Sequence, residues 1–152
     1  MDKFSFSMKK QIGISLLEVL LSLSIIAIIF VMATRYFFVA TNNNKVNTSI
    51  SQVGGLVAAL HNWKGIKPAF TGASIQALYD AGQLENFPGL NDSSTANVSV
   101  NDLWGDSFSI TSAVENKVTI SVTLPNKGNC QALANAYISA ICNGATFNYT
   151  FS

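Results

Sequence analysis

A single carboxylate interrupts the one long apolar stretch of this chain. Residues 14–33 form a run of twenty in which Glu18 is the only charged side chain, five positions after Gly13. A carboxylate at membrane depth costs about 2.5–3.5 kcal/mol on insertion scales, so a chain that keeps one there is expected to use it. The chemistry predicted for Glu18 is ion pairing with a cation that the run itself does not contain.

Few other residues have the types and spacing that chemistry requires. His61 is the only histidine and is expected to be structural, with a catalytic role as the alternative. One histidine and two cysteines that are expected in a disulfide provide no zinc site, and no Ser/His/Asp set has a recognisable spacing. Asp102 and Asp106 are expected to be turn residues, with a calcium site as the alternative. Trp63 and Trp104 are expected in the core, with a ligand platform as the alternative. We therefore predict no enzymatic activity, no catalytic residues, no cofactor and no metal.

The apolar run must be positioned by a helix. It contains no Gly and no Pro, and at 1.5 Å per residue it spans about 30 Å, the hydrocarbon thickness of a bilayer. A cleaved secretory signal would have a shorter apolar region of about 7–15 residues, ending at a site such as Ala-x-Ala. Ala27 and Ala33 do not form such a site, so a membrane-spanning helix is the better interpretation.

The charge distribution predicts the orientation of this helix. Lys3, Lys9 and Lys10 precede it with Asp2 as the only acid, which gives the first thirteen residues a charge of +2 and the rest −1. Positive charge before a first apolar segment keeps that end in the cytoplasm, so the remainder is expected outside it. A net charge of only +1 argues against nucleic-acid binding through a basic patch.

The two cysteines, Cys130 and Cys142, would then face an oxidising compartment. A disulfide between them is expected, worth about 3 kcal/mol by loop entropy. Two separate buried thiols are the alternative.

The helix is predicted to continue to about residue 63. After Arg35, apolar residues recur with spacings of 4, 3, 4 and 3, which is one helical stripe. Its members are Val46, Ile50, Val53, Val57 and Leu60. Gly54 and Gly55 weaken the helix locally, by about 1 kcal/mol each relative to Ala.

The second half predicts a small α+β head. We expect a helix from Ser74, as its N-cap, to about Asp80, then a loop over 84–97. Strands are predicted at 107–111, 117–124 and 146–151, with a hairpin turn at Glu115 and Asn116. A helix is predicted at 130–141, with Leu133, Tyr137 and Ile141 on one side. The antiparallel sheet is expected to pack on the stripe.

Residues 13–18 (Gly-Ile-Ser-Leu-Leu-Glu) resemble the signature of the type IV pilin family. The resemblance implies a leader of residues 1–13 that prepilin peptidase removes between Gly13 and Ile14. It also implies N-methylation of Ile14. Glu18 becomes the fifth mature residue, and in the family it pairs with the N-terminal amine of a neighbouring subunit. That amine has a pKa near 8 and is cationic at neutral pH.

Later segments are similar to type IVb pilins in the same order. They are residues 70–78 with Ala81 and Gly82, residues 102–105, and Pro125 followed by residues 130–133. The chain departs from the family in three ways: the leader is shorter than is common in type IVb, the first mature residue is Ile, and no Pro kinks the helix.

The resemblance implies a structural subunit, major or minor, of a filament for adhesion, motility or DNA uptake. Residues 14–34 would be the transmembrane and filament-core helix, and residues 35–152 the head. Expected partners are other pilin subunits, prepilin peptidase, the inner-membrane assembly platform and the inner membrane, with no specific nucleic acid. The subunit would sit in the inner membrane with its C-terminus periplasmic, then in the extracellular pilus. The alternatives are a type II secretion pseudopilin and an uncleaved single-pass protein with a periplasmic binding domain.

Overall fold

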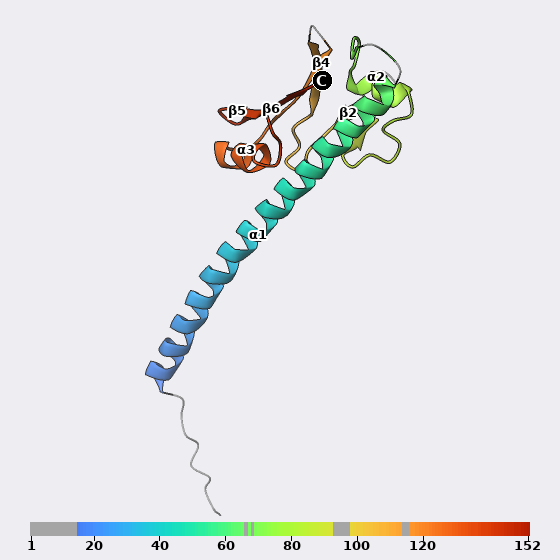
Figure 1. Cartoon of the computed structure of the whole chain (residues 1–152). Coiled ribbons are helices and arrows are strands. Elements are labelled where there is room, and N and C mark those ends of the chain that lie inside the picture. Colours follow the sequence, from blue (N-terminus) through green and yellow to red (C-terminus); the bar gives the residue numbers. More distant parts are fainter. Residues whose placement is uncertain (1–14, 66, 68, 93–97, 114–115) are drawn as a thin grey trace, which may run out of the picture. The chain divides into compact units, whose positions relative to one another are not determined.

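The computed structural model describes residues 15–65, 67, 69–92, 98–113 and 116–152 (Figure 1). The chain divides into two compact units, residues 1–40 and 41–152. One helix, α1 (Leu16–Lys64), contributes to both units. Its bounds confirm the predicted long helix to within two residues. The predicted leader, with Gly13 and Ile14, lies outside the described residues.

In the first unit, α1 exposes apolar side chains on every side. Large exposed side chains follow one another from Leu16 to Val39. The hydroxyls of Ser22 and Ser24 donate to the carbonyls four residues earlier, at 2.8 Å each. These bonds satisfy the hydroxyls within the helix, as a lipid environment requires. By length and composition this helix is able to cross a membrane.

In the second unit, α1 buries one face against the head. The predicted stripe is present, with Val46, Val53 and Leu60 buried and Ile50 and Val57 partly buried. The buried face is wider than the stripe, because a core-facing helix presents more than two positions per turn. It also includes Ser49, Gln52, Leu56 and Ala59.

The short helix α2 (Ile75–Asp80) forms as predicted. The Ser74 hydroxyl accepts a hydrogen bond from the Ala77 N–H at 3.1 Å, which is the contact of an N-cap. The chain turns after the helix at Gly82, whose φ of 69° lies in the region that favours glycine.

Four strands form one antiparallel sheet in the order β3-β4-β6-β5. They are β3 (Ser109–Ala113), β4 (Lys117–Thr123), β5 (Ala140–Asn143) and β6 (Thr146–Phe151). The predicted final strand and the strand from 117 are confirmed. β3 and β4 pair as the predicted hairpin, with Asn116 at a φ of 64°, while Glu115 of the predicted turn lies outside the described residues. The first of these strands begins two residues later than predicted, because Ser107 pairs with Asn101 and pairing with β4 starts only at Ser109.

The predicted loop over 84–97 contains one element that the sequence did not indicate. β1 (Leu90–Asn91) pairs with β2 (Ser99–Val100) as a separate two-stranded sheet. Gly89 precedes β1 with a φ of 81°, and a Cβ there would overlap the Asn101 carbonyl oxygen. Only glycine allows these two backbones to approach so closely.

The predicted helix at 130–141 is wrong at both ends. The observed α3 (Lys127–Ala134) starts three residues earlier, because the Asn126 side chain caps it by accepting from the Asn129 N–H at 2.9 Å. Residues 140–143 are instead strand β5, paired with β6, and Ser139 before them has a φ of 74°, which no α-helix contains. Leu133 is therefore buried in a helix, while Ile141 is exposed on an edge strand.

The core of the second unit joins α1 to the sheet. Val118, Ile120, Val122 and Leu124 point to one face, as predicted, and all are at most 2% exposed. They form one cluster with Val53, Leu56 and Leu60 of α1 and with residues of α2, α3 and β6. The fold is thus α+β, with a long apolar N-terminal helix, antiparallel sheets and a disulfide near the C-terminus.

Candidate functional site

Glu18 lies in the first turn of α1, in the first unit. Its backbone N–H donates to the Ser15 carbonyl at 2.9 Å, which begins the helix, and its side chain is exposed. The positive end of the helix dipole favours a carboxylate at this position. The fold thus holds the Glu18 carboxylate at the start of a regular helix.

The surroundings of Glu18 along the helix are apolar. Leu16 and Leu17 before it are 79% and 73% exposed, and Leu21 follows it one turn later. The nearest cation on the same helix is Arg35, which a rise of 1.5 Å per residue places about 25 Å away along the axis. Arg35 is therefore too far to pair with Glu18, and residues 15–40 contain no other cationic side chain.

The two cysteines are joined as a disulfide. It links α3 to β5, with the two Cα atoms 6.0 Å apart, and Cys130 is fully buried. β5 is an edge strand of the sheet and precedes the final strand in the chain. The disulfide therefore holds α3 beside this edge.

Polar contacts between α1 and the head form a second set of positioning residues, which the sequence analysis missed. Asn42 and Asn129 exchange two amide hydrogen bonds, at 2.9 and 3.1 Å. The Gln52 amide donates to the carbonyls of Pro88 at 2.8 Å and Asn101 at 3.0 Å, and Gln52 is 2% exposed. The only sequence feature that could have indicated the role of Gln52 was its place, as a polar residue, beside the apolar stripe.

Asp102 closes the turn that precedes β3. One of its carboxylate oxygens accepts from the Trp104 and Asp106 N–H groups, at 2.9 Å each. Burial raises the pKa of Asp102 above its usual value, partly offset by these two hydrogen bonds. The predicted turn role of Asp102 is therefore confirmed. In the part of the chain that the structure describes, no three His, Cys, Asp or Glu side chains gather as a metal site would require.

His61 and the two tryptophans lie at the edges of the core. The His61 ring stacks on Phe151 with centroids 5.3 Å apart, and its Nδ1 is 2.9 Å from the Val57 carbonyl oxygen. Trp63 and Trp104 are partly buried against the core. These contacts give all three residues packing roles.

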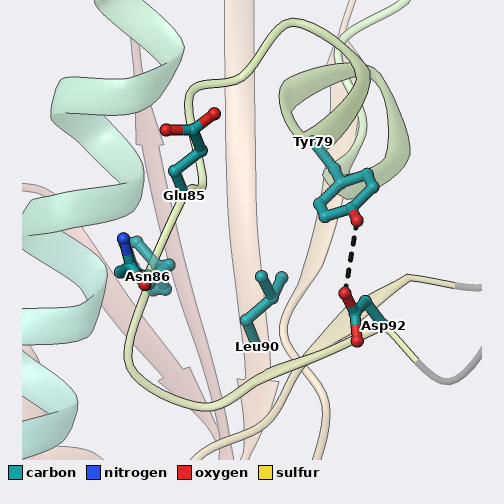
Figure 2. Close-up of a pocket in the computed structure, with 6 residues that line it drawn as sticks. Tyr79, Glu85, Asn86, Leu90 and Asp92 are labelled. Carbon is teal, nitrogen blue, oxygen red and sulfur yellow. Dashed lines mark hydrogen bonds between the residues drawn. The ribbon is translucent and has the colours of Figure 1, made fainter.

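The head also has a pocket that no sequence pattern indicated. It has a volume of about 580 Å³ and is lined by Tyr79, Glu85, Asn86, Phe87, Leu90 and Asp92. Figure 2 shows the Tyr79 hydroxyl directed at Asp92, to which it donates a hydrogen bond at 3.3 Å. Asp92 raises the pKa of the Tyr79 hydroxyl through its charge and through this bond.

Comparison of the chain with curated proteins and with solved structures gave no match. Residues 8–34 do match the family model of the prokaryotic N-terminal methylation motif. This segment includes Gly13, Ile14 and Glu18 and most of the exposed apolar part of α1. The motif is typical of the processed N-termini of type IV pilins and pseudopilins, and it supports a pilin-like protein that is processed and methylated at its N-terminus.

Proposed function

We propose that this chain is a structural subunit of a type IV pilus, of the type IVb kind. The observation that carries the proposal is the match of residues 8–34 to the N-terminal methylation motif. The exposed apolar side chains of α1 in residues 15–40 agree with the proposal, because a helix that is apolar on all sides needs lipid or other helices around it.

The proposed maturation starts with removal of residues 1–13 by prepilin peptidase. The bond cut is the one between Gly13 and Ile14, and the new amine of Ile14 is then methylated. The methylation motif supports this order, because the methylated residue is the one that cleavage exposes. The mature chain would begin two residues before α1.

The proposed role of Glu18 is to pair with the Ile14 amine of a neighbouring subunit. Apolar contacts between helices are non-directional and fix the relative height of two helices poorly. A buried carboxylate is tolerated only with a partner, so an ion pair between subunits selects one register out of many. The distance from Glu18 to Arg35 supports a partner outside this helix.

The proposed organisation has three parts. Residues 1–13 are the leader, residues 14–34 cross the inner membrane and later fill the filament core, and residues 35–152 form the head. The positive leader supports a cytoplasmic N-terminus and a periplasmic C-terminus. Assembly would require the inner-membrane platform and other pilin subunits, as a homopolymer or with minor pilins, and would place the heads on the surface of an extracellular filament.

The test is mass spectrometry of the N-terminus of the protein extracted from membranes. A mature chain that starts at Ile14 and carries an added methyl group is the expected result. The same protein from cells without prepilin peptidase is the control and should keep residues 1–13. An intact leader in cells with an active peptidase would overturn the proposal and favour an uncleaved single-pass protein with a periplasmic binding domain.

A type II secretion pseudopilin is the second candidate, because the same motif is typical of its N-terminus. The Cys130–Cys142 disulfide favours the pilus, since many pseudopilins lack such a pair. Electron microscopy of the cell surface with an antibody against the head separates the two. Labelled fibres along their length indicate a major pilin, label at the tip a minor pilin, and no surface fibre a pseudopilin.

A further inference from the structure

Four consecutive side chains near the end of the apolar part of α1 form a collar around the helix. They are Arg35, Tyr36, Phe37 and Phe38. Successive residues of an α-helix lie about 100° apart around its axis, so these four side chains point in directions that together cover the circumference. All four are exposed, and the three aromatic residues are between 65% and 78% exposed.

The collar lies where the composition of α1 changes from apolar to polar. Residues 19–34 before it contain no charged side chain, and residues 41–44 after it read Thr-Asn-Asn-Asn. The change takes place within about two helical turns. The collar therefore stands at the boundary between an apolar environment and water.

Arg35 and Tyr36 have the chemistry that a layer of lipid headgroups requires. A guanidinium group donates paired hydrogen bonds to phosphate oxygens. Tyrosine is enriched at membrane surfaces, because its ring lies in the apolar layer while its hydroxyl reaches water. Glu18 is the only acidic residue of α1, so Arg35 has no carboxylate within reach on its own helix.

Lipid explains the exposure of the collar on all sides. A single protein partner would cover one face of the helix, whereas headgroups surround a membrane helix completely. The collar also continues the exposed apolar surface of the segment that is able to cross a membrane, without a break in the helix. Both its charge and its position thus favour a phospholipid surface as the occupant.

We propose that the collar binds the phospholipid headgroups of the periplasmic leaflet and thereby sets the depth of α1 in the inner membrane. Arg35 binds lipid phosphate, and the three rings lie between the phosphates and the upper acyl chains. This proposal rests on the membrane crossing of residues 14–34 that is proposed above.

A depth set by the collar places Glu18 at the opposite membrane surface. Glu18 and Arg35 are about 25 Å apart along the helix, and a bilayer thins locally around a helix slightly shorter than its hydrocarbon layer of about 30 Å. The Glu18 side chain also tilts toward the N-terminus of α1, which directs it out of the hydrocarbon. Before assembly its carboxylate then lies among the cytoplasmic headgroups, where a charge costs less than at the bilayer centre.

The test is NMR of the full chain in nanodiscs of phosphatidylethanolamine and phosphatidylglycerol, with one chain in each disc. Lipids with a nitroxide beside the headgroup broaden amide signals near the membrane surface, and lipids with a nitroxide at the end of the acyl chain broaden those near the centre. The amides of Glu18 and Phe37 should respond more to the first probe. The amide of Ile26, halfway between Glu18 and Arg35, should respond more to the second.

Combining Arg35→Leu with Tyr36→Leu tests whether the collar sets the depth. The double variant lengthens the uncharged run from residues 19–34 to residues 19–40, so the centre of the run moves by about three residues toward the C-terminus. The amide that is broadened most by the chain-end nitroxide should move by the same amount. Phe30→Leu, which removes an exposed ring inside the run, is the matched control and should leave that position unchanged.

Three results would overturn this proposal while leaving the membrane crossing intact. They are a Phe37 amide that the headgroup nitroxide does not broaden, a double variant with unchanged depth, and ring contacts to a second, differently labelled chain in place of headgroup broadening. The last result would assign the collar to contacts between copies of α1. An Ile26 amide that neither probe broadens would instead show that α1 does not enter the bilayer, and the membrane crossing would then fail together with the collar.

Discussion

The proposed role of Glu18 predicts that membrane insertion and assembly respond differently to its loss. Glu18→Ala removes a charge from an apolar helix, so the protein should insert in the membrane at least as well as before. Assembly should fall strongly, because the amine of the neighbouring subunit loses its partner. Membrane fractionation measures insertion, and the yield of sheared fibres measures assembly.

Ser22→Ala is the matched control for Glu18→Ala. Ser22 lies one turn further along α1, and its hydroxyl bonds to the Glu18 carbonyl within the same helix. Its removal should change neither insertion nor fibre yield. A normal fibre yield from Glu18→Ala would remove Glu18 from its proposed role.

Gln52 predicts a stability effect that its neighbours do not share. Gln52→Ala would leave the Pro88 and Asn101 carbonyls without their donor and open a small cavity in a buried site. We expect a loss of about 2–4 kcal/mol in the free energy of unfolding. Chemical denaturation measures it, with Ser51→Ala, exposed and bonded within α1, as the control expected to change little. A loss as small as that of Ser51→Ala would contradict this account.

Asp102 predicts a dependence of stability on pH. Burial raises its pKa in the folded protein, so the folded state binds a proton more tightly than the unfolded state does. Its contribution is therefore most favourable below the unfolded pKa of about 3.9 and is lost as the pH rises through the raised folded value. Relative to Asp102→Asn, the unmodified protein should gain stability as the pH falls from 7 to 4. Denaturation of both proteins across this range checks the difference, and parallel curves would exclude the effect.

At the scale of elements, sequence patterns predicted the helices and strands that are specified by residues close together in the chain. The spacing of Val46 to Leu60 gave the amphipathic part of α1, Ser74 gave the start of α2, and strict alternation gave β4. The prediction for residues 127–143 was wrong for a physical reason. Spacings of four residues from Leu133 to Ile141 fit a helix locally, but β5 forms through its pairing with β6, which no local pattern reveals.

The cap of α3 is the local signal that would have corrected the predicted start of this helix. Asn126→Ala removes the side chain that accepts from the Asn129 N–H, so α3 should lose about 0.5–2 kcal/mol of stability. Lys127→Ala is the control, since Lys127 is exposed at the first position of the helix. Denaturation midpoints of both variants measure the difference. Equal midpoints would show that the Asn126 side chain does not stabilise the start of α3.

At the scale of the whole molecule, the fold class and the exposed apolar helix could be predicted, but the pocket could not. The fold class follows from one long helix and alternating segments, which are visible in sequence. The pocket depends on bringing α2 and the end of β1 together, so that the Tyr79 hydroxyl reaches Asp92. Its Tyr79 and Asp92 are thirteen positions apart, with no spacing that marks them as neighbours.

The division into two units predicts that the second unit folds without the first. Among the residues that the structure describes, all those buried in the core lie between Val46 and Phe147, inside residues 41–152, and so does the disulfide. A fragment of residues 41–152 should therefore be soluble without detergent and unfold cooperatively, because it keeps the whole core and leaves out the apolar part of α1. Gel filtration and thermal unfolding by circular dichroism measure this.

The full chain in detergent is the reference for this fragment. Its head should melt at nearly the same temperature, since residues 16–40 contribute no buried side chain to the core. The shortened α1 should remain helical in the fragment, because Asn42 still bonds to Asn129 and Gln52 to the carbonyls opposite it. A fragment that aggregates, or that melts without a cooperative transition, would show that the apolar helix is needed to fold the head and not only to anchor and assemble it.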